Sequence, residues 1–228
     1  MSTAIARAAA LALALAACKD PNANVPRART AAPTAPTTQP APAAVERLAF
    51  GPPQSSVGFT GAKVTGSHNG SFGVFSGTIQ LDPSNLTASR VEVTIETSSV
   101  QADDPRLTNH LKSPDFFDIA NHPRATFAST EVRAGGADGA THTLTGNLTL
   151  HGVTRAVTFP ATISVTPTEV SARAAFTINR REFGLTYPGM PDNLIRDEVA
   201  IRLDIHAPRG GAAPAAPTAP AAPAAPAQ

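Results

Sequence analysis

The sequence predicts an all-β protein of eight antiparallel strands, with one short helix inserted between the third and the fourth strand. Three observations predict this class. Between residues 51 and 207, apolar and polar residues alternate along successive segments, as they do in sheets that bury one face. Short turns, several of them rich in glycine, separate these segments. One stretch, residues 103–118, breaks the alternation and has the spacing of a helix.

The strands carry apolar residues at every second position. The third is the clearest, because Val91, Val93 and Ile95 alternate with charged and hydroxyl residues. In the second strand the parity of the aromatic residues changes at Gly73, which predicts a bulge or bend there. A tight reversal is expected at residues 151–152. The predicted strands span residues 55–60, 71–81, 90–100, 125–133, 141–150, 155–166, 170–179 and 198–206.

The helical stretch has its own start and stop signals. Asp103 or Asp104 can cap its first turn, and Pro105 suits the first helical position. Pro114 ends the helix. We expect this insertion to act as a plug or lid for the container that the strands build. Its predicted apolar face holds Leu107, His110 and Leu111.

The two ends of the chain differ in composition from the middle. Residues 1–17 have one positive residue and a short apolar run, which predicts a secretory signal. The ending Leu15-Ala16-Ala17-Cys18 resembles the lipobox of bacterial lipoproteins, which implies lipidation of Cys18 and attachment to a membrane; an ordinary signal with a chance cysteine is the alternative. Lys19 after the cysteine favours the outer membrane by the sorting rule of enterobacterial lipoproteins. The expected location is therefore the bacterial periplasm, with the protein anchored by its lipid to the outer membrane.

The remaining segments give the expected domain organisation. Residues 18–45 and 208–228 are rich in alanine and proline, with threonine in the first, and predict a disordered tether and a disordered tail. Residues 46–207 form the folded domain. The net charge of +1 and the scattered basic residues argue against a nucleic-acid partner. A single cysteine excludes an intramolecular disulfide.

Eight one-sided strands can bury their apolar face in a sandwich or in a closed barrel. Many inward positions hold alanine, glycine, serine or threonine, which argues for unfilled volume inside. The pattern alone leaves both architectures open.

Five blocks of residues, in order along the chain, are similar to one known family. They are Gly-x-Phe-x-x-Phe-Ser-Gly-x-Ile (70–79), Arg-x-x-x-His-Leu-x-Ser-x-Asp-Phe-Phe (106–117), Pro-x-Ala-x-Phe (123–127), Gly-Asn-Leu-Thr-Leu-His-Gly-Val-Thr (146–154) and Asn-Arg-Arg-Glu-Phe-Gly-Leu (179–185). Over residues 50–207 the chain resembles the YceI-like family of bacterial envelope proteins.

The resemblance implies an eight-stranded lipocalin-like β-barrel whose hydrophobic tunnel takes a polyisoprenoid, a quinone tail or a related amphiphile. No other cofactor is implied. Many relatives carry a histidine soon after the phenylalanine of the first strand, whereas Phe59 is followed by Thr60-Gly61-Ala62-Lys63 and the next histidine is His68. The head-group chemistry of this protein is therefore expected to differ.

The alternation and the matching blocks supply candidate ligand contacts. For Phe116 and Phe117, filling the barrel end is the expected role and ligand contact the alternative. For Arg106, an ion pair with Asp103 or Asp118 is expected before a contact with a head group. The head-group candidates are His68, Arg106, His110 and Arg180. The expected tunnel-lining residues are Phe75, Ile79, Val93, Ile95, Phe116, Phe117, Phe127, Leu144, Leu148, Phe176 and Ile178.

Two other functions remain open at this level. An enzyme acting on a lipid-like substrate would need His68, His110 or His151 to meet in a cleft, and no catalytic motif supports it. No two histidines have the helical spacing of a zinc site, so no metal is predicted. An envelope scaffold with a packed barrel would have no internal cavity. Pairing of two identical chains is also left open.

Overall fold

The computed structural model describes residues 20–35 and 45–210. Cys18, the signal segment before it and nearly all of the predicted tail lie outside these residues. In the part of the chain that is described, no helix is long and apolar enough to cross a membrane.

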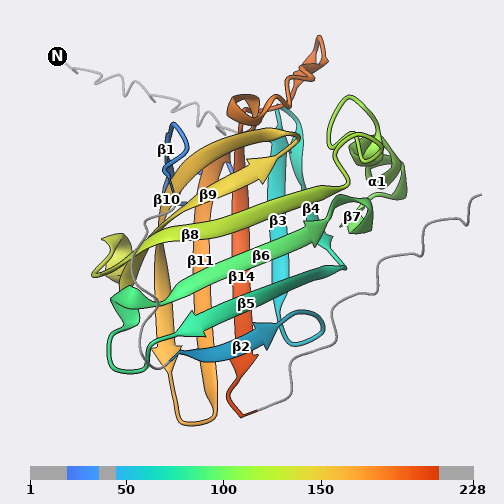
Figure 1. Cartoon of the computed structure of the whole chain (residues 1–228). Helices are drawn as coiled ribbons and strands as arrows, with labels where there is room; N and C mark the ends of the chain where they lie inside the picture. The colour runs from blue at the N-terminus through green and yellow to red at the C-terminus, as the bar shows by residue number, and fades with distance from the viewer. Residues whose placement is uncertain (1–19, 36–44, 211–228) are drawn as a thin grey trace, which may run out of the picture.

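The described residues form strands β1 to β14, one α-helix and four short 3-10 helices (Figure 1). The strands are β1 (Arg29–Ala31), β2 (Glu46–Phe50), β3 (Ser56–Lys63), β4 (Gly66–Phe72), β5 (Phe75–Leu81), β6 (Arg90–Glu96), β7 (Val100–Ala102), β8 (Arg124–Ala134), β9 (His142–Leu150), β10 (Val153–Val165), β11 (Glu169–Asn179), β12 (Gly189–Met190), β13 (Asn193–Leu194) and β14 (Glu198–Pro208). The helices are α1 (Pro105–Lys112), η1 (Leu86–Ala88), η2 (Thr97–Ser99), η3 (Ala137–Gly139) and η4 (Arg180–Phe183).

All strands except β12 and β13, which pair only with each other, build one strongly curled antiparallel sheet. Its hydrogen-bonded order is β2-β5-β6-β8-β9-β10-β11-β14-β3-β4-β7, and β1 pairs with β10 beside this path. In Figure 1 the strands β2, β5, β6, β8 and β9 run diagonally in front of the nearly vertical strands β11, β14 and β3. The sheet therefore folds over on itself, so that the same face of the sheet lines the interior from both layers.

Strand β10 carries the chain from one layer to the other. Its first part, Val153–Ala161, pairs with β9 in the front layer, whereas Thr162–Val165 pairs with β11 behind. Long strands that bend in this way form the corners where two layers of sheet meet. The bend in β10 is what gives the molecule an enclosed interior.

The expected all-β antiparallel fold is confirmed, but the expected closed barrel of eight strands is wrong, because the sheet does not close. The sheet path has β2 at one end and β7 at the other, and its eleven strands form a half-barrel. Near the β2 end, the guanidinium of Arg209, just after β14, donates to Glu46 at the start of β2, with 2.8 Å between Nη2 and Oε2. The short strands at the ends of the path carry too few residues to show an alternation in the sequence.

The predicted second strand, residues 71–81, is two strands in the structure. Strand β4 ends at Phe72 and pairs with β3 and β7, whereas β5 begins at Phe75 and pairs with β2 and β6. Between them Gly73 donates its N–H to the carbonyl of Ser99. Of the bulge or bend predicted at Gly73, the bend is confirmed, and it carries the chain from one layer to the other.

The helix is confirmed in its position and in its cap. Helix α1 lies between β7 and β8, and the side chain of Asp104 accepts from the backbone N–H groups of Arg106 and Leu107. The C-cap is Ser113, directly before Pro114. The predicted reversal is confirmed too, since His151 and Gly152 both have positive φ angles, 50° and 74°.

Part of the predicted tether is ordered against the sheet. Strand β1 pairs with β10, and Ala28 is buried. The Asn22 side chain, also buried, donates its Nδ2–H to the carbonyl of Thr60. These contacts are mostly made by backbone and amide groups, so a low content of apolar side chains did not exclude them. The expectation of a disordered segment over 18–45 is therefore wrong for residues 20–35.

The core lies on the inner face of the curl in two clusters. One cluster surrounds the loop after α1 and includes Val100, Leu111 and Phe183. The other lies toward β2 and β5 and includes Leu48 and Leu81. Between the walls that these clusters reinforce, the interior is not completely filled.

Candidate ligand-binding cavity

A cavity of about 550 Å³ lies between the two layers of the sheet. Pockets that bind small molecules commonly have volumes of about 300–1,000 Å³. The wall is built almost wholly from apolar side chains of β3, β5, β6, β8, β9, β10, β11 and β14. A packed scaffold would lack such a space, so this observation speaks against that alternative.

Strand β11 shows how the sequence builds this wall. Alternate residues along it line the cavity, whereas Ala175, between two of them, is exposed on the other face. Small residues at the middle of the series leave room that leucine or phenylalanine would fill. The lining residues of β11 at this period are Val170, Ala172, Ala174, Phe176 and Ile178.

Phenylalanine rings in the wall lie flat over glycines of neighbouring strands. A β-carbon built on Gly70 would lie 2.2 Å from Cζ of Phe59, and one built on Gly146 would lie 2.4 Å from Cζ of Phe127. Because these glycines have no side chain, the rings rest against the sheet instead of standing into the cavity. The glycines among the inward positions thus keep the interior open.

Aromatic rings close the end of the cavity next to α1. Phe117 meets Phe59 and Phe72 edge-on, with ring centroids 6.3 and 5.6 Å apart. Phe116 packs against His110 and Tyr187, at centroid distances of 4.9 and 5.4 Å. Both phenylalanines after the helix are buried and border the cavity. They therefore fill the end of the curl and form part of its wall at the same time.

All the expected lining residues except Phe75 border the cavity. Phe75 is buried in the core cluster that contains Leu48 and Leu81 and does not reach the cavity wall. It is the first residue of β5, so it packs at the strand end rather than over the open interior. Sequence alternation missed several wall residues outside its clear strands; Phe50 lies in the short strand β2, and Tyr187 follows η4 in a loop.

Two of the head-group candidates are polar residues in the wall. Nδ1 of His68 lies 2.8 Å from Oδ1 of Asp103, and Nε2 of His110 lies 2.9 Å from Oδ2 of Asp115. Both imidazoles border the cavity and are also partly exposed, with 32% and 38% of the side chain accessible. They therefore mark places where the cavity comes close to solvent.

Arg106 lies away from the cavity. Its side chain is exposed on α1, and it forms no ion pair in the described part of the chain. The expected pair with Asp103 or Asp118 is wrong, because Asp103 binds His68 and Asp118 accepts from the side chain of Asn121. The Arg106 side chain therefore has no ion-pair partner among the described residues and does not border the cavity.

Arg180 is a clamp for the loop that follows η4. The residue is only 5% exposed, and its guanidinium donates to the carbonyls of Leu185, Ile195 and Arg196 and to the carboxylate of Asp197. Burial lowers the pKa of this guanidinium from its ordinary value. Although Arg180 borders the cavity, most of its donors are committed to the protein.

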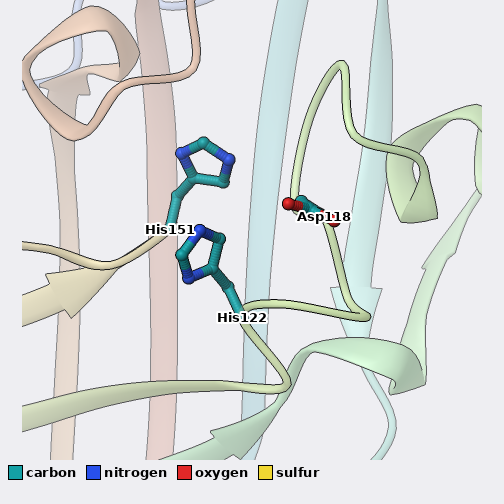
Figure 2. Close-up of side chains that lie close together, drawn as sticks. All are labelled: Asp118, His122 and His151. Atoms are coloured by element: carbon teal, nitrogen blue, oxygen red, sulfur yellow. The ribbon is translucent and has the colours of Figure 1, made fainter.

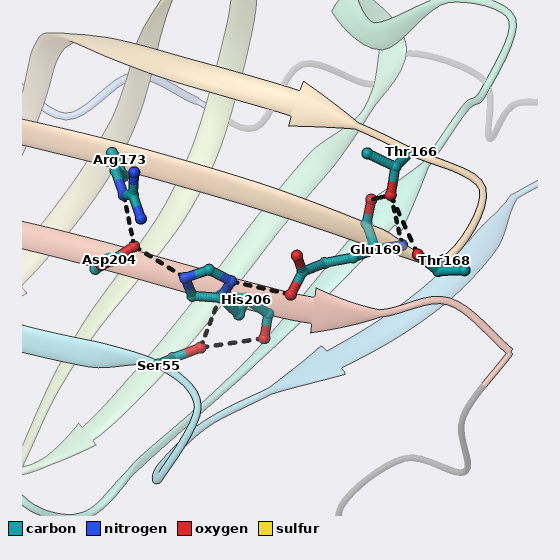
Figure 3. A network of polar contacts seen from close by, with 7 residues as sticks. All are labelled: Ser55, Thr166, Thr168, Glu169, Arg173, Asp204 and His206. Atoms are coloured by element: carbon teal, nitrogen blue, oxygen red, sulfur yellow. Dashed lines mark hydrogen bonds and ion pairs between the residues drawn. The ribbon is translucent and has the colours of Figure 1, made fainter.

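Ser55, His206 and Asp204 lie close together near the start of β3 and have the residue types of a hydrolase triad (Figure 3). The Oγ of Ser55 bonds the backbone N–H and carbonyl of His206, not its ring. The ring nitrogens of His206 face Glu169 and Asp204, at 2.9 and 3.1 Å. The hydrogen bond between nucleophile and base that such a triad requires is therefore not formed.

The histidines named for an enzymatic site do not come together. His68 and His110 each face an aspartate, as described above, and His151 lies against His122 instead. The described residues therefore do not assemble the cleft that the enzyme alternative requires.

Comparison with known sequences places the domain in a family. A family model described as a YceI-like domain matches residues 49–207. A UPF0312 protein of Pectobacterium atrosepticum is 46% identical over 92 residues, which cover 40% of this chain and 46% of the relative. The chain thus spans about half the length of that relative. A UPF0312 protein of Pseudomonas putida is 33% identical over 139 residues, 58% of this chain and 71% of the relative.

Solved structures have the same fold. BcnA of Burkholderia cenocepacia is 25% identical, with a TM-score of 0.59, over 67% of this chain and 95% of BcnA. A polyisoprenoid binding domain from Saccharophagus degradans is 14% identical, with a TM-score of 0.57, over 73% of this chain and 99% of that domain, so it shows the fold alone. The family match includes the whole cavity wall, from Phe50 to Ile205. The chain belongs to the YceI-like domain family.

Proposed function

We propose that the protein binds a long apolar chain, such as a polyisoprenoid or the tail of a quinone, inside the curled sheet. The observation that carries this proposal is the apolar cavity between the two layers. Its wall has few polar groups and no assembled catalytic set in the described residues, which suits a ligand held by burial rather than by chemistry.

Burial of the chain supplies the affinity. Each buried methylene contributes about 0.8 kcal/mol, so one five-carbon isoprene unit offers roughly 4 kcal/mol before the costs of ordering are subtracted. A few units therefore suffice for tight binding. The polyisoprenoid-binding relative with the same fold supports this class of ligand.

The head group of the ligand is proposed to lie near His68 and His110. These residues are polar, border the cavity and are partly exposed. Arg106 and Arg180 are not proposed as contacts, since the first is outside the wall and the second is occupied by loop carbonyls.

The protein is proposed to work in the bacterial periplasm, held at the outer membrane by lipidated Cys18. The signal segment and the cysteine at its end support this location. A membrane-held binding protein would store an apolar molecule or pass it through the envelope, where the ligand is otherwise insoluble in water.

The test is mass spectrometry of an organic extract of the protein purified from its native host. The expected result is a stoichiometric polyisoprenoid, quinone or related amphiphile that is absent from an extract of a control protein purified in the same detergent. The same measurement is repeated after incubation with excess quinone or prenol. An empty extract in both experiments contradicts the proposal.

A further inference from the structure

Two histidines and an aspartate converge beside the cavity end that Phe117 and Leu150 help to close (Figure 2). Asp118 and His122 belong to the segment between α1 and β8, and His151 belongs to the turn between β9 and β10. One nitrogen of each imidazole and one carboxylate oxygen lie within 4.8 Å of one another, and all three residues are partly buried.

The backbone brings Asp118 and His122 to the same side of their loop. Asp118 has a φ angle of 43°, and its carbonyl accepts from the backbone N–H groups of Asn121 and His122, at 3.0 and 2.8 Å. The carbonyl of His122 accepts from the hydroxyl of the buried Thr97, at 2.7 Å. The positions of the first two side chains are therefore fixed from both ends of the loop.

Two glycines provide the space in which the imidazoles approach one another. A β-carbon on Gly152 would lie 2.7 Å from Cε1 of His122, and one on Gly184 would lie 3.1 Å from Nδ1 of His151. The two rings consequently meet with centroids 4.6 Å apart and an angle of 62° between their planes. A β-carbon at either position would crowd one of the two rings.

The imidazoles of His122 and His151 lack hydrogen-bond partners within residues 20–35 and 45–210. The other four histidines, His68, His110, His142 and His206, each have a ring nitrogen within 3.1 Å of a carboxylate or hydroxyl oxygen. The carboxylate of Asp118 accepts from Nδ2 of Asn121 at 2.8 Å, which fixes its orientation. Two unpaired imidazoles and an oriented carboxylate together offer three atoms that can bind a metal ion.

We propose that Asp118, His122 and His151 bind one divalent transition-metal ion, with Zn²⁺ as the representative ion. Imidazole and carboxylate ligands suit zinc and its neighbours in the series, and three protein ligands leave a position for water. Tetrahedral metal–ligand distances of about 2.0–2.1 Å separate ligand atoms by roughly 3.3 Å, so small side-chain rotations complete the site. The ion fastens the loop after α1 to the β9–β10 turn, next to the cavity end.

Isothermal titration calorimetry of the full chain, purified in detergent and stripped of metal with a chelator, tests this proposal with Zn²⁺ alone. One ion per chain is the expected stoichiometry. The three single variants Asp118→Asn, His122→Asn and His151→Asn should each weaken Zn²⁺ binding at least about tenfold. Asparagine is chosen at positions 118 and 151 because it tolerates the positive φ angle there. His142→Asn, at the opposite end of β9, is the matched control and should bind as the wild type does.

A second measurement keeps the proposal testable if a variant fails to fold. Co²⁺ added to the metal-free wild-type chain should give the visible absorption bands of a four- or five-coordinate ion, and Zn²⁺ should remove them. No saturable Zn²⁺ binding, equal affinity of the wild type and His151→Asn, or a Co²⁺ spectrum identical to that of the free ion would each overturn the proposal.

Discussion

The ring of Phe50 lies over the α-carbon of Gly77, its neighbour across the β2–β5 pair, so closely that a β-carbon at position 77 would come within 2.0 Å of the ring. The three heavy atoms nearest to this hypothetical carbon all belong to the Phe50 ring. Together with the pairs Phe59–Gly70 and Phe127–Gly146, this contact explains how large aromatic residues line the interior without occupying it.

Gly77→Ala should lower the free energy of unfolding by about 1–3 kcal/mol, because Phe50 must leave its place against the sheet. Chemical denaturation of the two proteins measures the difference. Gly61→Ala is the matched control, since a β-carbon there meets nothing within 4 Å. A similar small effect of both substitutions would mean that the Phe50 ring is not held by the glycine.

Arg180→Met should lower the free energy of unfolding by about 2–4 kcal/mol, because several loop carbonyls lose their donor together. Arg181→Met is the control, since Arg181 is exposed and its nearest approach to Asp197 is 3.9 Å. Denaturation reports the stability of each variant, and a quinone titration reports its affinity. An Arg180 variant of unchanged stability and strongly reduced affinity would instead make this residue a head-group contact.

Acid should weaken the bond between Asp103 and strand β4. Hydrogen bonds from the Asn69 backbone and from His68 lower the pKa of the Asp103 carboxyl below its ordinary value of 3.8. A lowered pKa in the folded state stabilises the protein above the ordinary value, and this contribution is lost as the pH falls through the lowered value.

Thermal unfolding of the wild type and Asp103→Asn across this range measures the effect. The wild type should be the more stable at neutral pH, and the difference should shrink as the pH falls below about 4. Asp192→Asn, at an exposed position without an ion pair in the described chain, should show no such trend. A difference that stays constant with pH contradicts the assignment.

Cys18→Ser should release the protein from the membrane fraction, because the proposed lipid anchor needs a thiol and Cys18 is the single cysteine of this sequence. Fractionation of cells followed by immunoblotting measures the distribution. Metabolic labelling with a fatty acid should mark the wild type and leave the variant unlabelled. An unlabelled wild-type protein would show that the cysteine ends an ordinary signal.

The alternation of residues predicted the inner face of the sheet well, because one buried face imposes a period of two on every long strand. Val93, Ile95, Phe176 and Ile178 reach the cavity for this reason. The sequence did not show that the sheet stays open between β2 and β7, since both end strands are too short to show a period.

The roles of polar residues were harder to predict than the inner face. Arg180 looked available to a ligand, but its donors meet carbonyls of residues 185–196 that only the folded loop brings together. His151 joins Asp118 and His122 because the β9–β10 turn lies beside the loop after α1. The positions of these residues along the sequence do not indicate that the two segments meet.

The central claim, that an apolar chain occupies the cavity, is tested most directly by filling the cavity from one side of β11. Ala174 lines the interior and Ala175 faces outward on the same strand. Delipidated wild-type protein, Ala174→Phe and Ala175→Phe are titrated with a quinone that carries a long isoprenoid tail, and binding is followed by calorimetry. We predict that Ala175→Phe binds as the wild type does and that Ala174→Phe loses at least about tenfold in affinity, or about 1.4 kcal/mol; equal binding by all three folded proteins would contradict the account.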